Sequence, residues 1–304
     1  MDKLIKAIIA KDYNPTVVGL DPKLDYVPQY ILDKHLNEEN PFKGAADALF
    51  EFNKGLIDSL YDIVPAVKPQ SAYYEMYGIE GLMCLQKTME YAQSKGMYVI
   101  LDVKRGDIGA TAEAYSHGYI GKTAIGGKEY RAFGPDSLTV NPYLGTDGLK
   151  PFVKDAEEND KSLFILVKTS NPSSGELQDI VAQDGEKIYE KTAALVRTLG
   201  ESSVGEYGYS KVGAVVGATY PEQLKELREK MPNTFFLVPG YGAQVGKAED
   251  VALAFDKNRL GAIVNSSRGI MCAYKKGDWA PEQFGEAARA EAIRMRDDIL
   301  AYVK

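Results

Sequence analysis

Short apolar runs alternate with longer segments of mixed character along most of this chain. Several runs are apolar almost without interruption, whereas a strand with one face in water would alternate apolar and polar residues. Near-continuous apolar strands are typical of a parallel sheet that is covered on both faces. We predict eight strands, at residues 16–21, 66–70, 98–104, 137–143, 162–170, 211–219, 234–240 and 261–267.

Between these strands, apolar residues recur at spacings of three and four, the period of a helix with one buried face. Residues 79–96 show this pattern and end at Gly96, which suits a helix terminus. Pro221 begins a second such segment, 221–231. Eight strands that alternate with helices predict an α/β fold, a single (β/α)8 TIM barrel that forms one domain of residues 1–304. An open, doubly wound sheet is the alternative, but no G-x-G-x-x-G pattern follows the first strand.

Two connections are longer than the others. Residues 22–44 follow the first predicted strand and are rich in Pro, Asp and Lys, and residues 171–210 follow the fifth and contain further helical pattern. Long loops on a barrel often cover or build a site. No internal repeat or linker separates a second domain.

Composition and charge narrow the classes of function. The 304 residues carry a formal net charge of −7 without a long basic stripe, so we do not expect nucleic-acid binding. No apolar stretch approaches the roughly 20 residues that span a bilayer, and the N-terminal apolar run is too short for a signal peptide. Cys84 and Cys272 lack metal-ligand spacing, and only two histidines occur. We therefore expect reduced thiols, a cytoplasmic protein and no membrane partner.

Charged residues gather where the predicted strands end. Asp21 ends the first strand, Lys68 lies in the second, and Asp102 and Lys104 lie in the third, with Asp107 just beyond. The carboxyl ends of all barrel strands lie on one face, which carries the active sites of barrel enzymes. A charge inside an apolar strand is costly unless it is paired. The sequence therefore predicts one ion-pair cluster that contains Lys68, Asp102 and Lys104.

A second polar group follows the last two predicted strands. The glycines of PGYGAQVG (239–246) would let backbone N–H groups approach an anion, and Arg268 in NSSRG could bind a phosphate. The loops after strands seven and eight are the usual phosphate site of such barrels. This pattern predicts a phosphorylated substrate whose reacting end lies near strands two and three.

Each of these residues also has a purely structural interpretation. Asp107 could cap the helix that follows it, and Lys68 could extend its ammonium to water. Asp21 could form a turn, Arg268 could be a surface cation, and Ser170 could be an ordinary loop hydroxyl. Their joint occurrence at strand ends favours a site over five independent structural roles.

The motifs GLDP, AVKPQ, DVKRGDIGAT, PGYGAQVG and NSSRG, in this order, make the chain resemble orotidine 5′-monophosphate (OMP) decarboxylases, most closely their longer bacterial branch. The resemblance covers nearly the whole chain, although D-x-K-x-x-D alone is shared with sister enzymes. It implies conversion of OMP to UMP and CO2 in pyrimidine synthesis, without metal, pyridoxal phosphate or thiamine. A metal-dependent sugar-phosphate enzyme and a catalytically silent nucleotide-binding protein are the alternatives.

The resemblance also implies a role for each matching residue. Lys68, Asp102 and Lys104 would form an array of alternating charge, which Asp107 of a second subunit completes in a homodimer. Lys104 would stabilise a carbanion at C6 of the pyrimidine and protonate it. The substrate-binding residues would be Asp21 at the ribose, Ser170 at the pyrimidine, Gln244 and Arg268 at the phosphate, and Ile108, Thr111 and Pro239.

Overall fold

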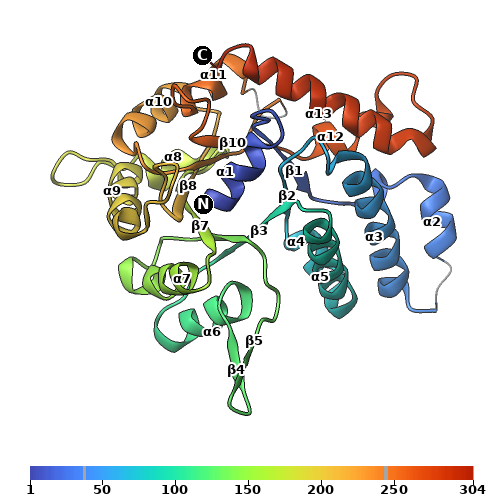
Figure 1. Cartoon of the computed structure of the whole chain (residues 1–304), viewed down its shortest axis with the longest axis horizontal. Coiled ribbons are helices and arrows are strands. Elements are labelled where there is room, and N and C mark those ends of the chain that lie inside the picture. The colour runs from blue at the N-terminus through green and yellow to red at the C-terminus, as the bar shows by residue number, and fades with distance from the viewer. Residues whose placement is uncertain (37–38, 243–245, 304) are drawn as a thin grey trace. The chain divides into compact units, whose positions relative to one another are not determined.

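The computed structural model describes residues 1–36, 39–242 and 246–303. Eight strands follow one another in the closed order β1-β10-β9-β8-β7-β6-β3-β2. This is the (β/α)8 barrel that the sequence predicts, and the open-sheet alternative is wrong. Figure 1 labels most of the helices and strands and colours the chain from its N-terminus to its C-terminus. The strands are β1 (Thr16–Leu20), β2 (Ala66–Pro69), β3 (Tyr98–Arg105), β6 (Ser137–Val140), β7 (Ser162–Lys168), β8 (Val212–Val216), β9 (Phe236–Val238) and β10 (Ala262–Ser266). Each coincides with a predicted strand to within a few residues.

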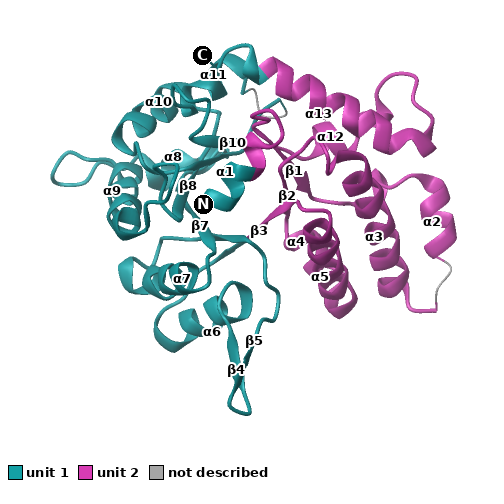
Figure 2. Cartoon of the chain, viewed as in Figure 1, with its two compact units in different colours: residues 1–6, 103–264, 299–304 teal, residues 7–102, 265–298 magenta. Residues whose placement is uncertain are grey.

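The chain divides into two compact units (Figure 2). Unit 1 comprises residues 1–6, 103–264 and 299–304, and unit 2 comprises residues 7–102 and 265–298. One boundary therefore falls inside β3, between Asp102 and Val103. The first helix, α1 (Asp2–Ile9), contains another boundary.

In unit 2, β1 pairs with β2, and β2 with β3, all in parallel. The helices are α2 (Gln29–His35), α3 (Pro41–Leu60), α4 (Ala72–Glu75), α5 (Gly78–Ser94), α12 (Arg268–Met271) and α13 (Phe284–Leu300), with 3-10 turns at Leu24–Tyr26, Ala273–Lys275 and Pro281–Gln283. Helix α5 confirms the predicted segment 79–96, and Gly96 follows it with φ +79°. Helix α3 begins after Asn40, whose side chain accepts hydrogen bonds from Phe42 N and Lys43 N.

In unit 1, strands β6 to β10 pair in parallel, each with the next along the chain. The helices are α6 (Gly109–Tyr119), α7 (Thr146–Glu158), α8 (Gly175–Gln178), α9 (Ile188–Gly200), α10 (Pro221–Lys230) and α11 (Ala248–Val251), with 3-10 turns at Pro172–Ser174, Glu201–Ser203 and Ala252–Ala254. Helix α10 confirms the predicted segment 221–231. The predicted long connection 171–210 contains α8 and α9, as its helical pattern indicates. None of the helices that the structure describes is long and apolar enough to cross a membrane.

Unit 1 also contains a hairpin that the sequence analysis did not predict. Strands β4 (Thr123–Ile125) and β5 (Lys128–Tyr130) pair antiparallel. Gly126 and Gly127 form the two-residue turn with φ +58° and +79°, a conformation that glycine adopts without steric cost. The strands have three residues each and no apolar run, so they carry little of the pattern that identifies a buried strand.

Candidate active site

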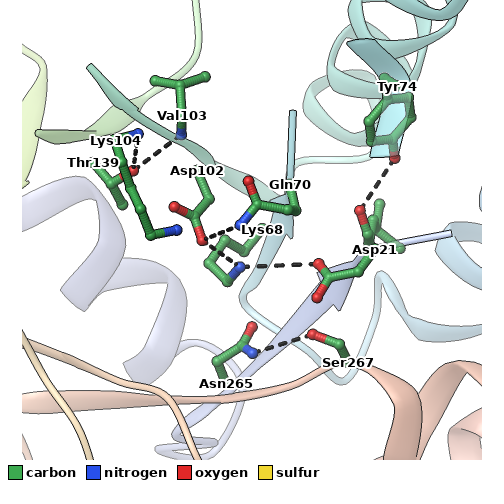
Figure 3. Close-up of polar contacts among 11 residues, drawn as sticks. Asp21, Lys68, Gln70, Tyr74, Asp102, Val103, Lys104, Thr139, Asn265 and Ser267 are labelled. Carbon is green, nitrogen blue, oxygen red and sulfur yellow. Dashed lines mark hydrogen bonds and ion pairs between the residues drawn. The ribbon is translucent and has the colours of Figure 1, made fainter. Parts of the chain in front are cut away.

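A buried ion pair joins β2 to β3 within unit 2 (Figure 3). Lys68 Nζ lies 2.8 Å from Asp102 Oδ2, and the two side chains are only 5% and 9% exposed. Asp21, directly after β1, has Oδ1 4.0 Å from the same ammonium, and Gln70 Nε2 donates a hydrogen bond to Asp102 Oδ2 at 3.0 Å. The predicted pairing of Lys68 with Asp102 is confirmed. The alternative in which Lys68 extends to water is wrong, because its ammonium is buried.

Strand register brings these residues together. Gly19 on β1 is opposite Lys68 on β2, and Gln70 forms a parallel bridge with Asp102 of β3. The backbone N–H of Ser71 donates to Asp102 O at 3.1 Å. Gly19 is required here, because a Cβ at this position would lie 1.9 Å from Ser267 Oγ. Lys68 and Asp102 therefore lie on paired strands, and Asp21 directly follows one, which limits the movement of all three side chains.

The charges of the carboxylates keep Lys68 cationic. Burial alone would lower the pKa of Lys68, but the negative charges of Asp102 and Asp21 and the hydrogen bond to Asp102 outweigh the loss of water and raise it above the usual value. An ammonium between two carboxylates forms a fixed alternation of charge. Such an alternation in a site with little water can stabilise charge that develops on a ligand.

Two of the buried oxygen atoms in unit 2 that lack a hydrogen-bond partner among the described residues belong to Asp21 and Asn265. They are Asp21 Oδ1 and Asn265 Oδ1. The amide nitrogen of Asn265 donates to Ser267 Oγ at 3.2 Å (Figure 3), so only its oxygen is unsatisfied. A buried acceptor without a donor costs about 1–3 kcal/mol. These two oxygens can accept hydrogen bonds from hydroxyl or N–H groups of a ligand.

Lys104 lies in unit 1, two residues after Asp102 along β3. Its φ is +49°, in the left-handed region that residues other than glycine rarely adopt. Thr139 of β6 supports this backbone, because its Oγ1 accepts hydrogen bonds from the N–H groups of Val103 and Lys104 at 3.0 and 2.9 Å (Figure 3). The Lys104 side chain is exposed. Backbone strain that neighbouring residues hold in place is common at functional sites.

The residues around the start of α6 present their side chains to solvent. Ile108 is 53% exposed, and Thr111 is exposed as well. Asp107 Oδ1 accepts a hydrogen bond from the N–H of Ile108 at 2.8 Å. The N-cap residue of α6 is Ile108, and no side chain caps this helix. The interpretation of Asp107 as a helix cap is therefore wrong.

The remaining predicted ligand-binding residues lie at or after strand ends. Ser170 and Pro239 are half-buried and follow β7 and β9 in unit 1. Arg268 begins α12 in unit 2 with an exposed side chain that forms no ion pair with the part of the chain that the structure describes. Gln244 lies outside the described residues.

Three polar residues of these strand ends were missed by the sequence analysis. Lys168 is completely buried at the end of β7, where it pairs with Asp179, and a charge within an apolar run was a signal that could have identified it. Gln70 and Thr139 carry no such signal, because their hydrogen bonds depend on strand register. Within the described ranges, no three His, Cys, Asp or Glu side chains converge so that they could hold a metal ion.

Comparisons with known proteins identify relatives of the whole chain. A family model described as orotidine 5′-phosphate decarboxylase / HUMPS family matches residues 32–280. The orotidine 5′-phosphate decarboxylase of Caldicellulosiruptor bescii is 45% identical over 303 residues, which cover 99% of this chain and 98% of the relative. The enzyme of that name from Clostridium tetani is 41% identical, over 99% and 97% of the two chains. A solved structure of Leishmania donovani OMP decarboxylase is 29% identical, with a TM-score of 0.72 and coverage of 99% and 98%.

Proposed function

The chain belongs to the orotidine 5′-phosphate decarboxylase family, and we propose from this premise that it converts OMP to UMP and CO2 in pyrimidine biosynthesis. The observation that carries the proposal is the buried Lys68–Asp102 pair with Asp21 beside it. Three charged groups that lie on paired strands or directly after one suit a reaction in which charge develops on one carbon atom. The enzyme is then a carboxy-lyase, and its substrate is a nucleotide.

Lys104 is the residue that we propose for carbanion stabilisation and protonation. Decarboxylation breaks the bond between C6 and the carboxylate and leaves the electron pair on C6, where the pyrimidine offers no obvious electron sink. A fixed ammonium beside C6 would stabilise this carbanion and then transfer a proton to it. The hydrogen bonds of the Val103 and Lys104 N–H groups to Thr139 support a fixed backbone for this role.

Lys68 and Asp102 would complete the electrostatic environment. Asp102 is held by two donors, Lys68 Nζ and Gln70 Nε2, at 2.8 and 3.0 Å. Repulsion of the departing carboxylate and orientation of the Lys104 ammonium would both require an aspartate that is held in this way. Neither role needs a metal or an organic cofactor, and we propose that the enzyme uses none.

The other matching residues would bind the parts of the substrate that do not react. The unsatisfied Oδ1 of Asp21 suits a ribose hydroxyl donor, and Arg268, which forms no ion pair with the described residues, suits the phosphate. We assign Gln244 to the phosphate as well, and Ser170 to the pyrimidine. The proposed substrate-binding set also includes Ile108, Thr111 and Pro239. Binding energy at the distant phosphate can help to order the reacting end.

We propose that the enzyme is a cytoplasmic homodimer in which Asp107, Ile108 and Thr111 reach the partner's site. Exposure of Ile108 and Thr111, and the absence of a capping role for Asp107, support this arrangement. We also propose that residues 1–304 act as one domain, because the family match runs through both units.

Mixing inactive Lys104→Ala and Asp107→Ala proteins should restore part of the activity if the two subunits of the proposed dimer share their sites. A mixture as inactive as its components would contradict shared sites.

A substrate assay tests the proposed reaction. Purified protein mixed with OMP should remove the absorbance of the substrate and produce UMP, at the same rate with and without EDTA. Folded protein that leaves OMP unchanged would overturn the proposal. Activity that is lost in EDTA and restored by Mg2+ would instead favour a sugar-phosphate enzyme of the same family model, whose description also includes HUMPS. UMP binding without turnover would favour a catalytically silent binding protein.

A further inference from the structure

We infer that Lys168, Gln178 and Asp179 act as positioning residues, which clamp the segment after β7 and thereby hold Ser170 against the base of the nucleotide. The inference rests on the proposed function for the identity of the ligand. We call these three residues, together with Thr169, the β7 clamp. All of its members lie in unit 1.

The first part of the clamp is a buried lysine that reaches forward along the chain. Lys168 Nζ lies 2.9 and 3.0 Å from the two carboxylate oxygens of Asp179, and the lysine side chain is 0% exposed. The ammonium also lies 4.7 Å from the ring centroid of Tyr220 and 5.6 Å from that of Tyr189. A buried ammonium is costly without such partners. The pair therefore ties the residue after α8 to the end of β7.

The second part is a pair of hydrogen bonds between neighbouring residues of the same two segments. The N–H of Thr169 donates to Gln178 Oε1 at 3.0 Å, and Gln178 Nε2 donates to Thr169 Oγ1 at 2.7 Å. Thr169 Oγ1 also donates to Asn171 Oδ1 at 2.7 Å. The Thr169 hydroxyl thus donates its only proton inside the protein and cannot donate it to a ligand as well.

Ser170, which directly follows the clamp, has a supported backbone and an uncommitted hydroxyl. Thr219 Oγ1 donates to Ser170 O at 3.2 Å, and Gly217 N donates to Lys168 O at 2.8 Å. Gly217 lies so close that a Cβ there would be 2.8 Å from Ser170 Cβ and 2.9 Å from Ser170 N. The hydroxyl of Ser170 forms no hydrogen bond with any residue that the structure describes.

This arrangement explains why the polar residues at this strand end have different roles. Lys168 and Thr169 form contacts with α8 and with the residue that follows it, and these contacts hold the segment after β7 in place. Ser170 is half-buried, its carbonyl oxygen accepts a hydrogen bond from Thr219 Oγ1, and its hydroxyl can donate and accept. A group that is fixed before the ligand arrives loses less entropy on binding. The clamp should therefore strengthen binding of the base and have no effect on a ligand that lacks one.

The test uses the full chain and two competitive inhibitors of OMP turnover, UMP and ribose 5-phosphate, which lacks the base. In Gln178→Ala, amide exchange at Thr169 should accelerate, and the inhibition constant of UMP should rise by about fivefold, the effect of one hydrogen bond. The inhibition constant of ribose 5-phosphate should stay unchanged. Asp184→Asn, which removes an exposed ion pair with Lys191 in the same segment, is the matched control and should change none of these values.

Asp179→Asn should show the same selective loss, and Asp179→Glu should restore most of the UMP affinity because it keeps the charge. If Asp179→Asn fails to fold, Gln178→Ala still decides the question, because it leaves no unpaired buried charge. Equal weakening of UMP and ribose 5-phosphate, or faster exchange with unchanged UMP inhibition, would overturn the positioning role. Wild-type protein that binds UMP without decarboxylating OMP would refute the proposed function alone, because direct UMP binding would still test the clamp.

Discussion

Two buried lysines at strand ends differ in the partners that surround them. Lys68 on β2 and Lys168 on β7 are 5% and 0% exposed, and each pairs with an aspartate, at 2.8 and 2.9 Å. Lys68 has a second carboxylate, Asp21, at 4.0 Å, whereas Lys168 has the rings of Tyr189 and Tyr220. The first cluster therefore carries two negative charges and one positive charge, and the second is neutral.

The origin of the partners separates the two clusters further. Asp102 lies on a strand in register with β2, and Asp21 directly follows one, so neither can move far. Asp179 comes from an irregular segment after α8, and its side chain is 33% exposed. A rigid cluster with excess charge suits action on a ligand, whereas a neutral pair that joins a strand to a loop suits positioning. A buried lysine alone therefore does not identify a catalytic group, because the same degree of burial occurs with different partners.

The largest expected effect tests the role that we propose for Lys104. Lys104→Ala should lower kcat by several orders of magnitude, because it would remove both the proposed cation beside C6 and the proposed proton donor. Steady-state turnover of OMP and the inhibition constant of UMP provide the measurement, and UMP binding should remain detectable. Lys104→Arg is the matched control, since it keeps the positive charge but replaces the ammonium with a weaker acid, and it should also lower kcat. Turnover by Lys104→Ala within tenfold of wild type would contradict the role.

The next effect compares the two lysines directly through stability. Lys68→Met leaves Asp102 buried without its ammonium, and should lower the free energy of unfolding by about 3–5 kcal/mol. Lys168→Met should cost less, because the partly exposed Asp179 can be hydrated once its partner is lost. Urea unfolding at pH 7 measures both values. A larger loss of unfolding free energy for Lys168→Met would contradict the expectation that the charge of Asp102 is more strongly confined than that of Asp179.

A third effect concerns a cation that, unlike both lysines, is exposed. Arg268→Ala should raise the inhibition constant of UMP by about 10- to 100-fold, because a hydrogen bond to a charged group contributes about 1.5–3 kcal/mol. Uridine, which lacks the phosphate, should bind with unchanged affinity. Arg259→Ala, an arginine in an exposed turn, is the control. Equal affinity of wild type and Arg268→Ala for UMP would contradict the proposed role of Arg268 in phosphate binding.

The smallest expected effect concerns Asp58, which belongs to a solvent-accessible ion-pair cluster and serves as a reference for the two buried clusters. Burial would raise the pKa of Asp58, but hydrogen bonds and charge from Lys95, Tyr91 and Lys54 lower it from 3.8 to about 2. A lowered pKa in the folded state stabilises the protein above pH 3.8, and this contribution disappears as pH falls toward 2. Asp58→Asn should cost less than about 1 kcal/mol at pH 7. Urea unfolding between pH 7 and 3 should show the difference shrinking; a difference that grows would contradict the assignment.

The pattern of apolar runs was enough to locate all eight barrel strands, because a strand buried on both faces needs almost every residue apolar. The hairpin β4–β5 was not predicted, for the opposite reason: its residues are mostly exposed, so its turn is the main local signal of its structure. Pairing of Lys68 with Asp102 followed from the cost of an unpaired buried charge. The same reasoning applied to Lys168 would have identified a buried cation but not its partner.

The sequence by itself determined where the strands lie, which polar residues stand at their ends and that the charges among them need partners, because these properties depend on local pattern and on the cost of burial. Only the tertiary structure decided that Gln70 donates a hydrogen bond to Asp102, that Thr139 supports the strained backbone at Lys104 and that Asp179 forms an ion pair with Lys168. Those choices depend on strand register and on the path of a long connection, which bring together residues far apart in the chain, and neither leaves a local signal in the order of residues.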